Sequence, residues 1–73
     1  MGVSYWTLKQ DHGWAVKKEG AARVSSVHSS QSDAWAEARR LARGADGEAR
    51  LKGTDGRIKA RSVYGKEPFP PKG

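Results

Sequence analysis

The sequence predicts an α+β fold: a single small domain in which one helix packs on one face of an antiparallel β-sheet, in the order β-β-α-β-β. Two observations predict it. A stretch near the middle of the chain has both a start and a stop signal for a helix, and the segments on either side alternate in polarity as strands do. The chain has 73 residues and no cysteine, so we expect one core that is held together by packing alone.

The helix is expected to run from Gln31 to Gly44. Ser30 and Asp33 have the spacing of a capping box, in which the hydroxyl and the carboxylate each accept a hydrogen bond from a free backbone N–H. Gly44 is expected to end the helix as a left-handed residue. Apolar residues recur at spacings of three and four and form one stripe toward the sheet: Ala34, Trp35, Ala38, Leu41 and Ala42.

The first strand is expected within Val3 to Lys9, because alternate residues of a strand point to opposite faces. Trp6 and Leu8 are expected on the core face and Tyr5 on the exposed face. A turn at residues 11–13 leads into the second strand, which begins at Trp14 and is expected to be long, with a bend at Gly20.

After the helix, residues 48–52 and 57–64 are expected to form a second hairpin around the turn signal Asp55-Gly56. We expect its inner face to pack against the helix through Ala49, Leu51, Ile58 and Ala60. The opposite face would carry five basic residues, offset only by Glu48: Arg50, Lys52, Arg57, Lys59 and Arg61. Such a face is either an anion-binding surface or a solvated face that keeps the protein soluble.

The charge of the chain favours acidic partners. Fourteen Lys and Arg against eight Asp and Glu give a net charge of +6. Nucleic acid and acidic protein surfaces are both candidates. The predicted basic face lacks the interleaved aromatic residues on which bases stack, so we expect phosphate contact rather than base recognition.

No pattern in the chain indicates an enzyme, a metal site or a cofactor. His12 and His28 are the only histidines, and neither has a serine or carboxylate at a spacing typical of a catalytic triad. The glycines lack the spacing of a phosphate-binding loop. No apolar run is long enough to cross a membrane, and the first residues lack a signal-peptide pattern, so we expect a cytoplasmic monomer without membrane contact.

Residues 65–73 hold all three prolines and are expected to form an extended tail outside the domain, which would span residues 1–64. Phe69 lies between two of these prolines. An exposed aromatic on a stiff segment loses little entropy when it docks, so Phe69 and Tyr5 are the expected aromatic anchors for a partner.

Four segments together resemble a bacterial family of small β-β-α-β-β proteins to which no chemistry is assigned: Trp14 to Gly20, Ala34 to Ala42, Asp55 to Ile58 and Tyr64 to Gly73. In size, the chain is also similar to a small bacteriophage protein that binds host RNA polymerase, inhibits initiation and promotes antitermination. The resemblance to the bacteriophage protein implies a phage-encoded protein that acts in the host cytoplasm.

We therefore expect a non-enzymatic transcription regulator that binds one or more subunits of bacterial RNA polymerase. The alternatives are a small basic module that binds nucleic acid, and an accessory or structural subunit with no nucleic-acid role. The expected partner-binding residues are Tyr5, Arg50, Lys52, Arg57, Lys59, Arg61 and Phe69.

Overall fold

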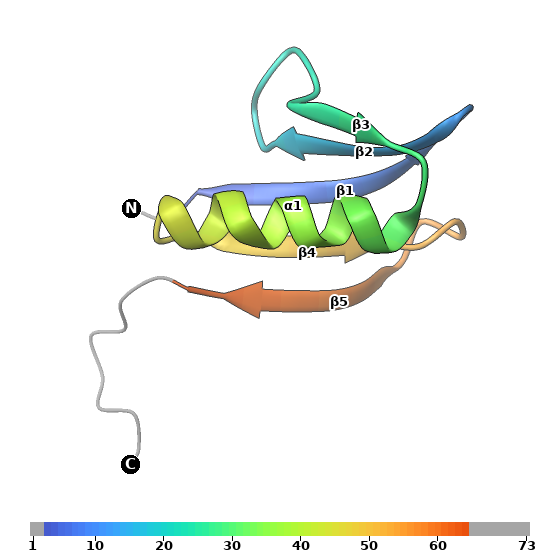
Figure 1. Ribbon diagram of the computed structural model, residues 1–73. Coiled ribbons are helices and arrows are strands. Elements are labelled where there is room, and N and C mark those ends of the chain that lie inside the picture. Colours follow the sequence, from blue (N-terminus) through green and yellow to red (C-terminus); the bar gives the residue numbers. More distant parts are fainter. Residues whose placement is uncertain (1–2, 65–73) are drawn as a thin grey trace.

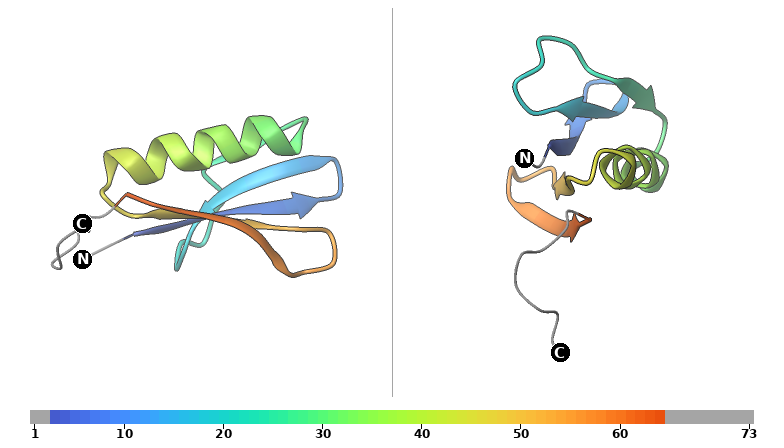
Figure 2. Two further views of the ribbon diagram at one scale, coloured as in Figure 1. Left: turned by 90° about the horizontal axis from the view of Figure 1, so that it is seen from below. Right: turned by 90° about the vertical axis from the view of Figure 1, so that its left-hand side faces the viewer.

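The computed structural model describes residues 3–64, which form a five-stranded sheet with one helix lying across it (Figure 1). The α+β class and the helix on one face are as the sequence predicts. Within residues 3–64, no helix or strand covers the opposite face of the sheet (Figure 2). The elements are β1 (Ser4–Gln10), β2 (Gly13–Lys18), β3 (Ser26–His28), α1 (Gln31–Gly44), β4 (Glu48–Lys52) and β5 (Ile58–Val63).

The sheet is mixed rather than fully antiparallel. Its strand order is β3-β2-β1-β4-β5, and the neighbouring strands β1 and β4 run parallel. The helix causes this arrangement, because it carries the chain back across the sheet and lets β4 begin beside the start of β1. All other neighbouring strands pair antiparallel.

The second strand is shorter than expected, because the chain reverses at Gly20 instead of bending there. Gly20 has a φ of 86°, a left-handed conformation that glycine adopts without strain. The returning segment forms β3, which pairs antiparallel with β2 so that Trp14 lies opposite His28. The prediction of one long strand was therefore wrong.

The helix limits agree with the prediction, but its end is built differently. Ser30 is the N-cap, and its hydroxyl accepts a hydrogen bond from the Asp33 backbone N–H at 3.2 Å. At the other end, Asp46 rather than Gly44 is the left-handed residue, with a φ of 54°. The backbone N–H of Gly47 donates to Ala42 O at 2.8 Å and that of Asp46 to Arg43 O at 3.3 Å, which is the Schellman pattern of helix termination.

The core lies between α1 and the sheet and is made of small side chains. Ala34, Ala38 and Ala42 of the helix and Val16 and Ala49 of the sheet have no exposed surface. Alanine at these helix positions lets the helix approach the sheet closely. Larger residues lie partly buried around this centre: Tyr5, Trp14, Trp35, Leu41 and Tyr64.

The two faces of β1 are the reverse of the expected ones. Thr7 is fully buried beneath the helix, where it pairs with Val16 on one side and Leu51 on the other. Since alternate residues point to opposite faces, Tyr5 packs against the core beside Thr7, whereas Trp6 and Leu8 lie on the face away from the helix. Tyr5 is therefore partly buried against the core, and the prediction that it is an exposed anchor was wrong.

A register shift in the second hairpin moves Ile58 out of the core. Ala49 and Leu51 are buried, and Ala60 pairs with Leu51, as expected. Between Leu51 and Lys52, however, the pairing with β5 shifts by one residue, so that Ile58 pairs with Lys52 and is 54% exposed. In residues 3–64, no helix is long and apolar enough to cross a membrane.

Candidate functional site

The open face of the sheet, meaning the face away from α1, carries a row of large side chains across four strands. Trp6 on β1 lies beside Lys17 on β2 and Arg50 on β4, and Arg50 lies opposite Arg61 on β5. With strands about 4.8 Å apart, this row extends over about 14 Å. An aromatic ring is thus placed among three cationic groups on a surface that no described element covers.

Trp6 is held from two sides. The Arg50 guanidinium carbon and the Lys52 Nζ each lie 5.2 Å from the centroid of its ring, within the range of a cation–π interaction. On the side of β2, its indole Nε1 donates a hydrogen bond to Glu19 Oε1 at 3.2 Å. These contacts orient a large ring that remains partly exposed.

Glu48 joins the cations at one end of the row. Its carboxylate forms ion pairs with Arg50 and Arg61, and it accepts hydrogen bonds from Ser4 Oγ at 3.1 Å and Arg61 Nε at 3.2 Å. Partial burial raises the pKa of Glu48, but the hydrogen bond from Ser4 and the two guanidinium groups outweigh this effect. The pKa of Glu48 therefore lies below its ordinary value of about 4.5.

This pKa shift predicts an acid-dependent loss of stability. Because the folded-state pKa is the lower one, the stabilisation by Glu48 is complete above about pH 4.5 and is lost as the pH falls through the folded pKa. We expect Glu48→Gln to lower the free energy of unfolding by about 1 kcal/mol at pH 7, and the difference from wild type to shrink between pH 5 and pH 2. Urea denaturation across this range measures both.

Glu37→Gln is the matched control. Hydrogen bonds from Arg40, at 2.9 and 2.6 Å, lower the pKa of Glu37, but this is a single pair on the helix surface. Its loss is expected to change stability by about 0.3–0.5 kcal/mol. A pH-independent effect of Glu48→Gln would contradict the role assigned to this carboxylate.

A hollow of about 240 Å³ lies beside Trp6 on the open face. It extends from β1 and β4 to the turn that follows β2. Its lining residues are Trp6, Leu8, Lys17, Lys18, Glu19, Gly20 and Lys52. Lys17 pairs with Trp6 and shares its face of the sheet, whereas Lys18 pairs with Tyr5 and its side chain belongs to the face under the helix.

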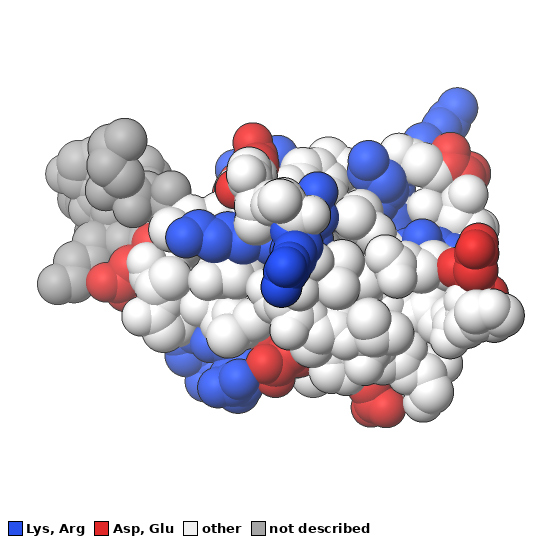
Figure 3. All heavy atoms as spheres, turned by 90° about the horizontal axis from the view of Figure 1, so that it is seen from above, with Lys and Arg blue, Asp and Glu red and all other residues white. Residues whose placement is uncertain are grey.

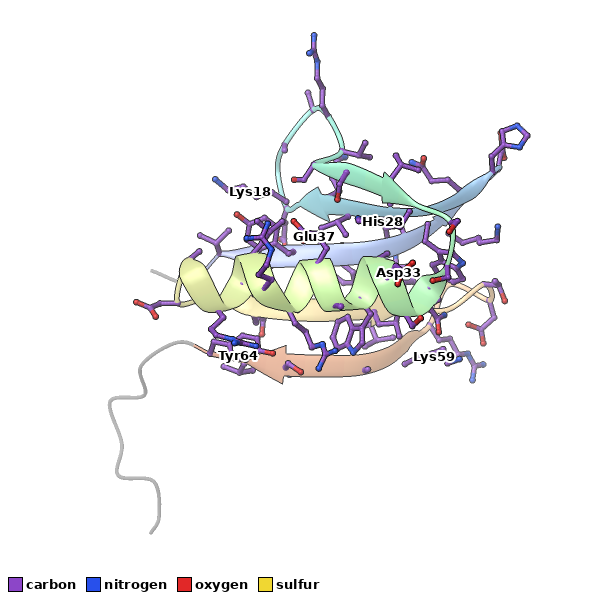
Figure 4. All side chains as sticks on the ribbon, in the orientation of Figure 1. Lys18, His28, Asp33, Glu37, Lys59 and Tyr64 are labelled. Atoms are coloured by element: carbon purple, nitrogen blue, oxygen red, sulfur yellow. The ribbon has the colours of Figure 1, made fainter. Side chains whose placement is uncertain are left out.

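The side of the sheet under the helix holds a second polar cluster near β3 (Figure 4). Ser26 Oγ and His28 Nε2 lie 2.8 Å apart. Glu37 of the helix interacts electrostatically with His28, but Arg40 binds both of the Glu37 carboxylate oxygens. The carboxylate is therefore held by Arg40 instead of orienting the imidazole, as a catalytic triad would require. In the described part of the chain, no three His, Asp or Glu residues converge as metal ligands would.

Basic residues are not confined to the open face. Figure 3 looks onto the β3 edge of the sheet, where Lys and Arg side chains are interspersed with Asp and Glu. On the helix, Arg39 lies 5.6 Å from the Trp35 ring, and Arg43 lies 5.7 Å from the Tyr64 ring. The open face differs from these surfaces because its aromatic ring lies in a row of cations on an uncovered sheet.

Comparison with known families places the whole described fold in one family. Residues 5–64 match the family DUF2188, described as an uncharacterized protein conserved in bacteria. The chain belongs to the DUF2188 family. The match begins in β1 and extends past β5, so it includes the helix and all five strands. No curated protein and no solved structure matches the chain.

The DUF2188 fold brings together three of the predicted partner-binding residues, Arg50, Lys52 and Arg61, on or beside the row. Arg57 lies in the second hairpin turn, where its backbone N–H donates to Asp55 Oδ1 at 3.0 Å. Lys59 is exposed at the turn end of β5 (Figure 4). Phe69 and the proline-containing segment lie outside the described residues.

The sequence prediction missed Trp6, Lys17 and Glu19 as members of the site in this DUF2188 chain. The alternation along β1 separates two faces, but it does not tell which of them the helix covers. One feature of the sequence could have found Lys17. The short turn at residues 11–12 sets the register of the first hairpin and pairs Lys17 with Trp6. Counting residues back from that turn would have placed the two side chains on one face.

Proposed function

We propose that this chain is a non-catalytic module that binds single-stranded nucleic acid on the open face of its sheet. The observation that carries the proposal is Trp6, a partly exposed ring with Arg50 and Lys52 each 5.2 Å from its centroid. Unpaired bases stack on aromatic and guanidinium planes, while lysine and arginine contact the phosphates between them. Both kinds of group lie side by side here.

Charge and shape support the same ligand. The net charge of +6 favours a polyanion, and the row from Lys17 through Trp6 to Arg61 gives a path of cations along which a backbone can run. Stacking on Trp6 requires a base whose face is free, which a duplex does not offer. We therefore propose a single strand, in the cytoplasm, as the ligand.

Fluorescence anisotropy with a labelled twelve-nucleotide strand tests this proposal. The RNA strand, the DNA strand of the same sequence and the corresponding duplexes are titrated with protein at low salt. We expect a single strand to bind more tightly than its duplex. Absence of binding to every single strand, or tighter binding to the duplexes, would overturn the proposal.

The salt dependence of binding tests whether the open face supplies the phosphate contacts. Each phosphate contact with a single strand contributes about 0.7 to the slope of log K against log salt concentration. We expect Lys52→Gln to lower that slope by about 0.7. Arg23→Gln removes the same charge from an exposed position between β2 and β3 and should leave the slope unchanged. Equal slopes for the two variants would show that the salt dependence reflects the net charge of the protein and not contacts made by the open face.

A second candidate is a regulator that docks on bacterial RNA polymerase. Three aliphatic residues favour a protein partner, because they are exposed on the open face or at its margin: Val27 (56% exposed), Ile58 (54%) and Val63 (48%). Apolar area of this kind slows dissociation, while the cations accelerate encounter. Binding to purified polymerase without binding to any single strand would replace the first candidate with this one.

A further inference from the structure

The hollow beside Trp6 has the size and polarity of a site for one unpaired base. Its volume of about 240 Å³ exceeds that of a purine, and it opens onto solvent along the open face. The Trp6 ring and Leu8 supply apolar contact for the plane of a base. The ammonium group of Lys17, which pairs with Trp6 on this face, and the carboxylate of Glu19 supply polar contact for its edge.

Glu19 is held in place at the rim of this hollow. Its backbone N–H donates to Ser4 O at 2.8 Å, which ties the residue to the first strand of the sheet. Its side chain accepts the hydrogen bond from Trp6 Nε1 at 3.2 Å. A carboxylate has about four lone-pair positions, so one bond from the indole leaves capacity for further N–H donors.

The edges of the four bases differ in how they match a carboxylate beside lysines. Guanine has two adjacent donors, N1–H and the N2 amino group, which fit the two oxygens of a carboxylate, and its neighbouring O6 accepts from an ammonium group. Adenine and cytosine offer one amino donor next to an acceptor nitrogen. Uracil has two carbonyl oxygens on either side of its single N–H, and they repel a carboxylate.

We propose, building on the proposed function, that the hollow selects guanine. The base stacks on Trp6, its N1–H and N2 amino group donate to Glu19, and its O6 accepts from Lys17. Glu19 is then the residue that determines specificity, while the cations of β4 and β5 on the open face bind the backbone without regard to sequence.

A set of twelve-nucleotide uridine RNAs tests this inference. In each, one central nucleotide is replaced by guanosine, adenosine or cytidine, and anisotropy is measured with wild type and with Glu19→Gln. A good two-point contact discriminates between bases by about fivefold or more. We expect the guanosine strand to bind wild type at least about fivefold more tightly than the all-uridine strand. Glu19→Gln should abolish this preference, because an amide offers one acceptor instead of two.

Glu37→Gln is the matched control, since it makes the same change on the helix side of the sheet and should keep the preference. Circular dichroism tests whether both variants keep the fold, which is expected because both side chains lie on the surface. Binding without a guanine preference, or a preference that survives Glu19→Gln, would overturn the guanine site and leave the proposed function standing. Absence of binding to every strand would overturn both.

Discussion

Gly47→Ala is expected to lower the free energy of unfolding by about 3 kcal/mol. Gly47 is buried where the chain leaves the helix and passes the start of β1. A Cβ atom there would lie 2.8 Å from both N and C of Val3 and closer still to its carbonyl oxygen. These are backbone atoms, and Val3 O also accepts the Glu48 N–H at 2.7 Å, so the strand cannot move away without losing that hydrogen bond.

Gly44→Ala provides the control of opposite sign. Gly44 is the last helical residue, and a Cβ atom on it would meet nothing within 4 Å. Alanine is favoured over glycine in a helix by about 0.5–1 kcal/mol, so this variant should be more stable than wild type. Urea denaturation followed by tryptophan fluorescence measures both variants. Equal stability of the two would contradict the close approach of Gly47 to Val3.

Trp6→Ala is expected to weaken the binding of single-stranded RNA by roughly 5- to 150-fold, since stacking on an aromatic residue contributes about 1–3 kcal/mol per base. Trp6 lies on the open face and takes no part in the core under the helix. The loss of affinity should therefore exceed the loss of stability. Trp6→Phe keeps an aromatic plane and should retain most of the affinity.

Anisotropy gives the affinity of the Trp6 variants, and thermal unfolding followed by circular dichroism gives their stability. If Trp6→Ala bound RNA as wild type does, Trp6 would not be the stacking platform. If it unfolded at much lower temperature than Trp6→Phe, the ring would be a structural element of the sheet, as the sequence alone had suggested.

Within the site, the cations were easier to predict than the aromatic residue. Arg50, Lys52 and Arg61 alternate with the buried Ala49 and Leu51 and the half-buried Ala60, so the polarity of their strands indicates an outward face without reference to other elements. β1 offers no such contrast. Both of its faces carry an aromatic residue. The pair Trp6 and Leu8 is more hydrophobic than the pair Tyr5 and Thr7, so hydrophobicity alone predicts the wrong face to be buried.

Local sequence signals were enough to predict the parts of the fold that depend on neighbours along the chain. Ser30 and the alanine stripe define the helix because capping and the 3.6-residue period act within a few residues. The turn around Asp55 is local in the same sense, since the Asp55 side chain binds the backbone of Arg57. These features are enough to predict the α+β class.

The buried face of β1 could not be predicted from local signals, because burial there depends on strands distant in sequence. Thr7 is buried because Val16 and Leu51 lie on either side of it under the helix, and the contact with Leu51 exists only once β4 pairs parallel with β1. The shift that exposes Ile58 likewise arises from the pairing of two strands. A strand's alternation specifies two faces, and the register with its partners selects the one that loses contact with water.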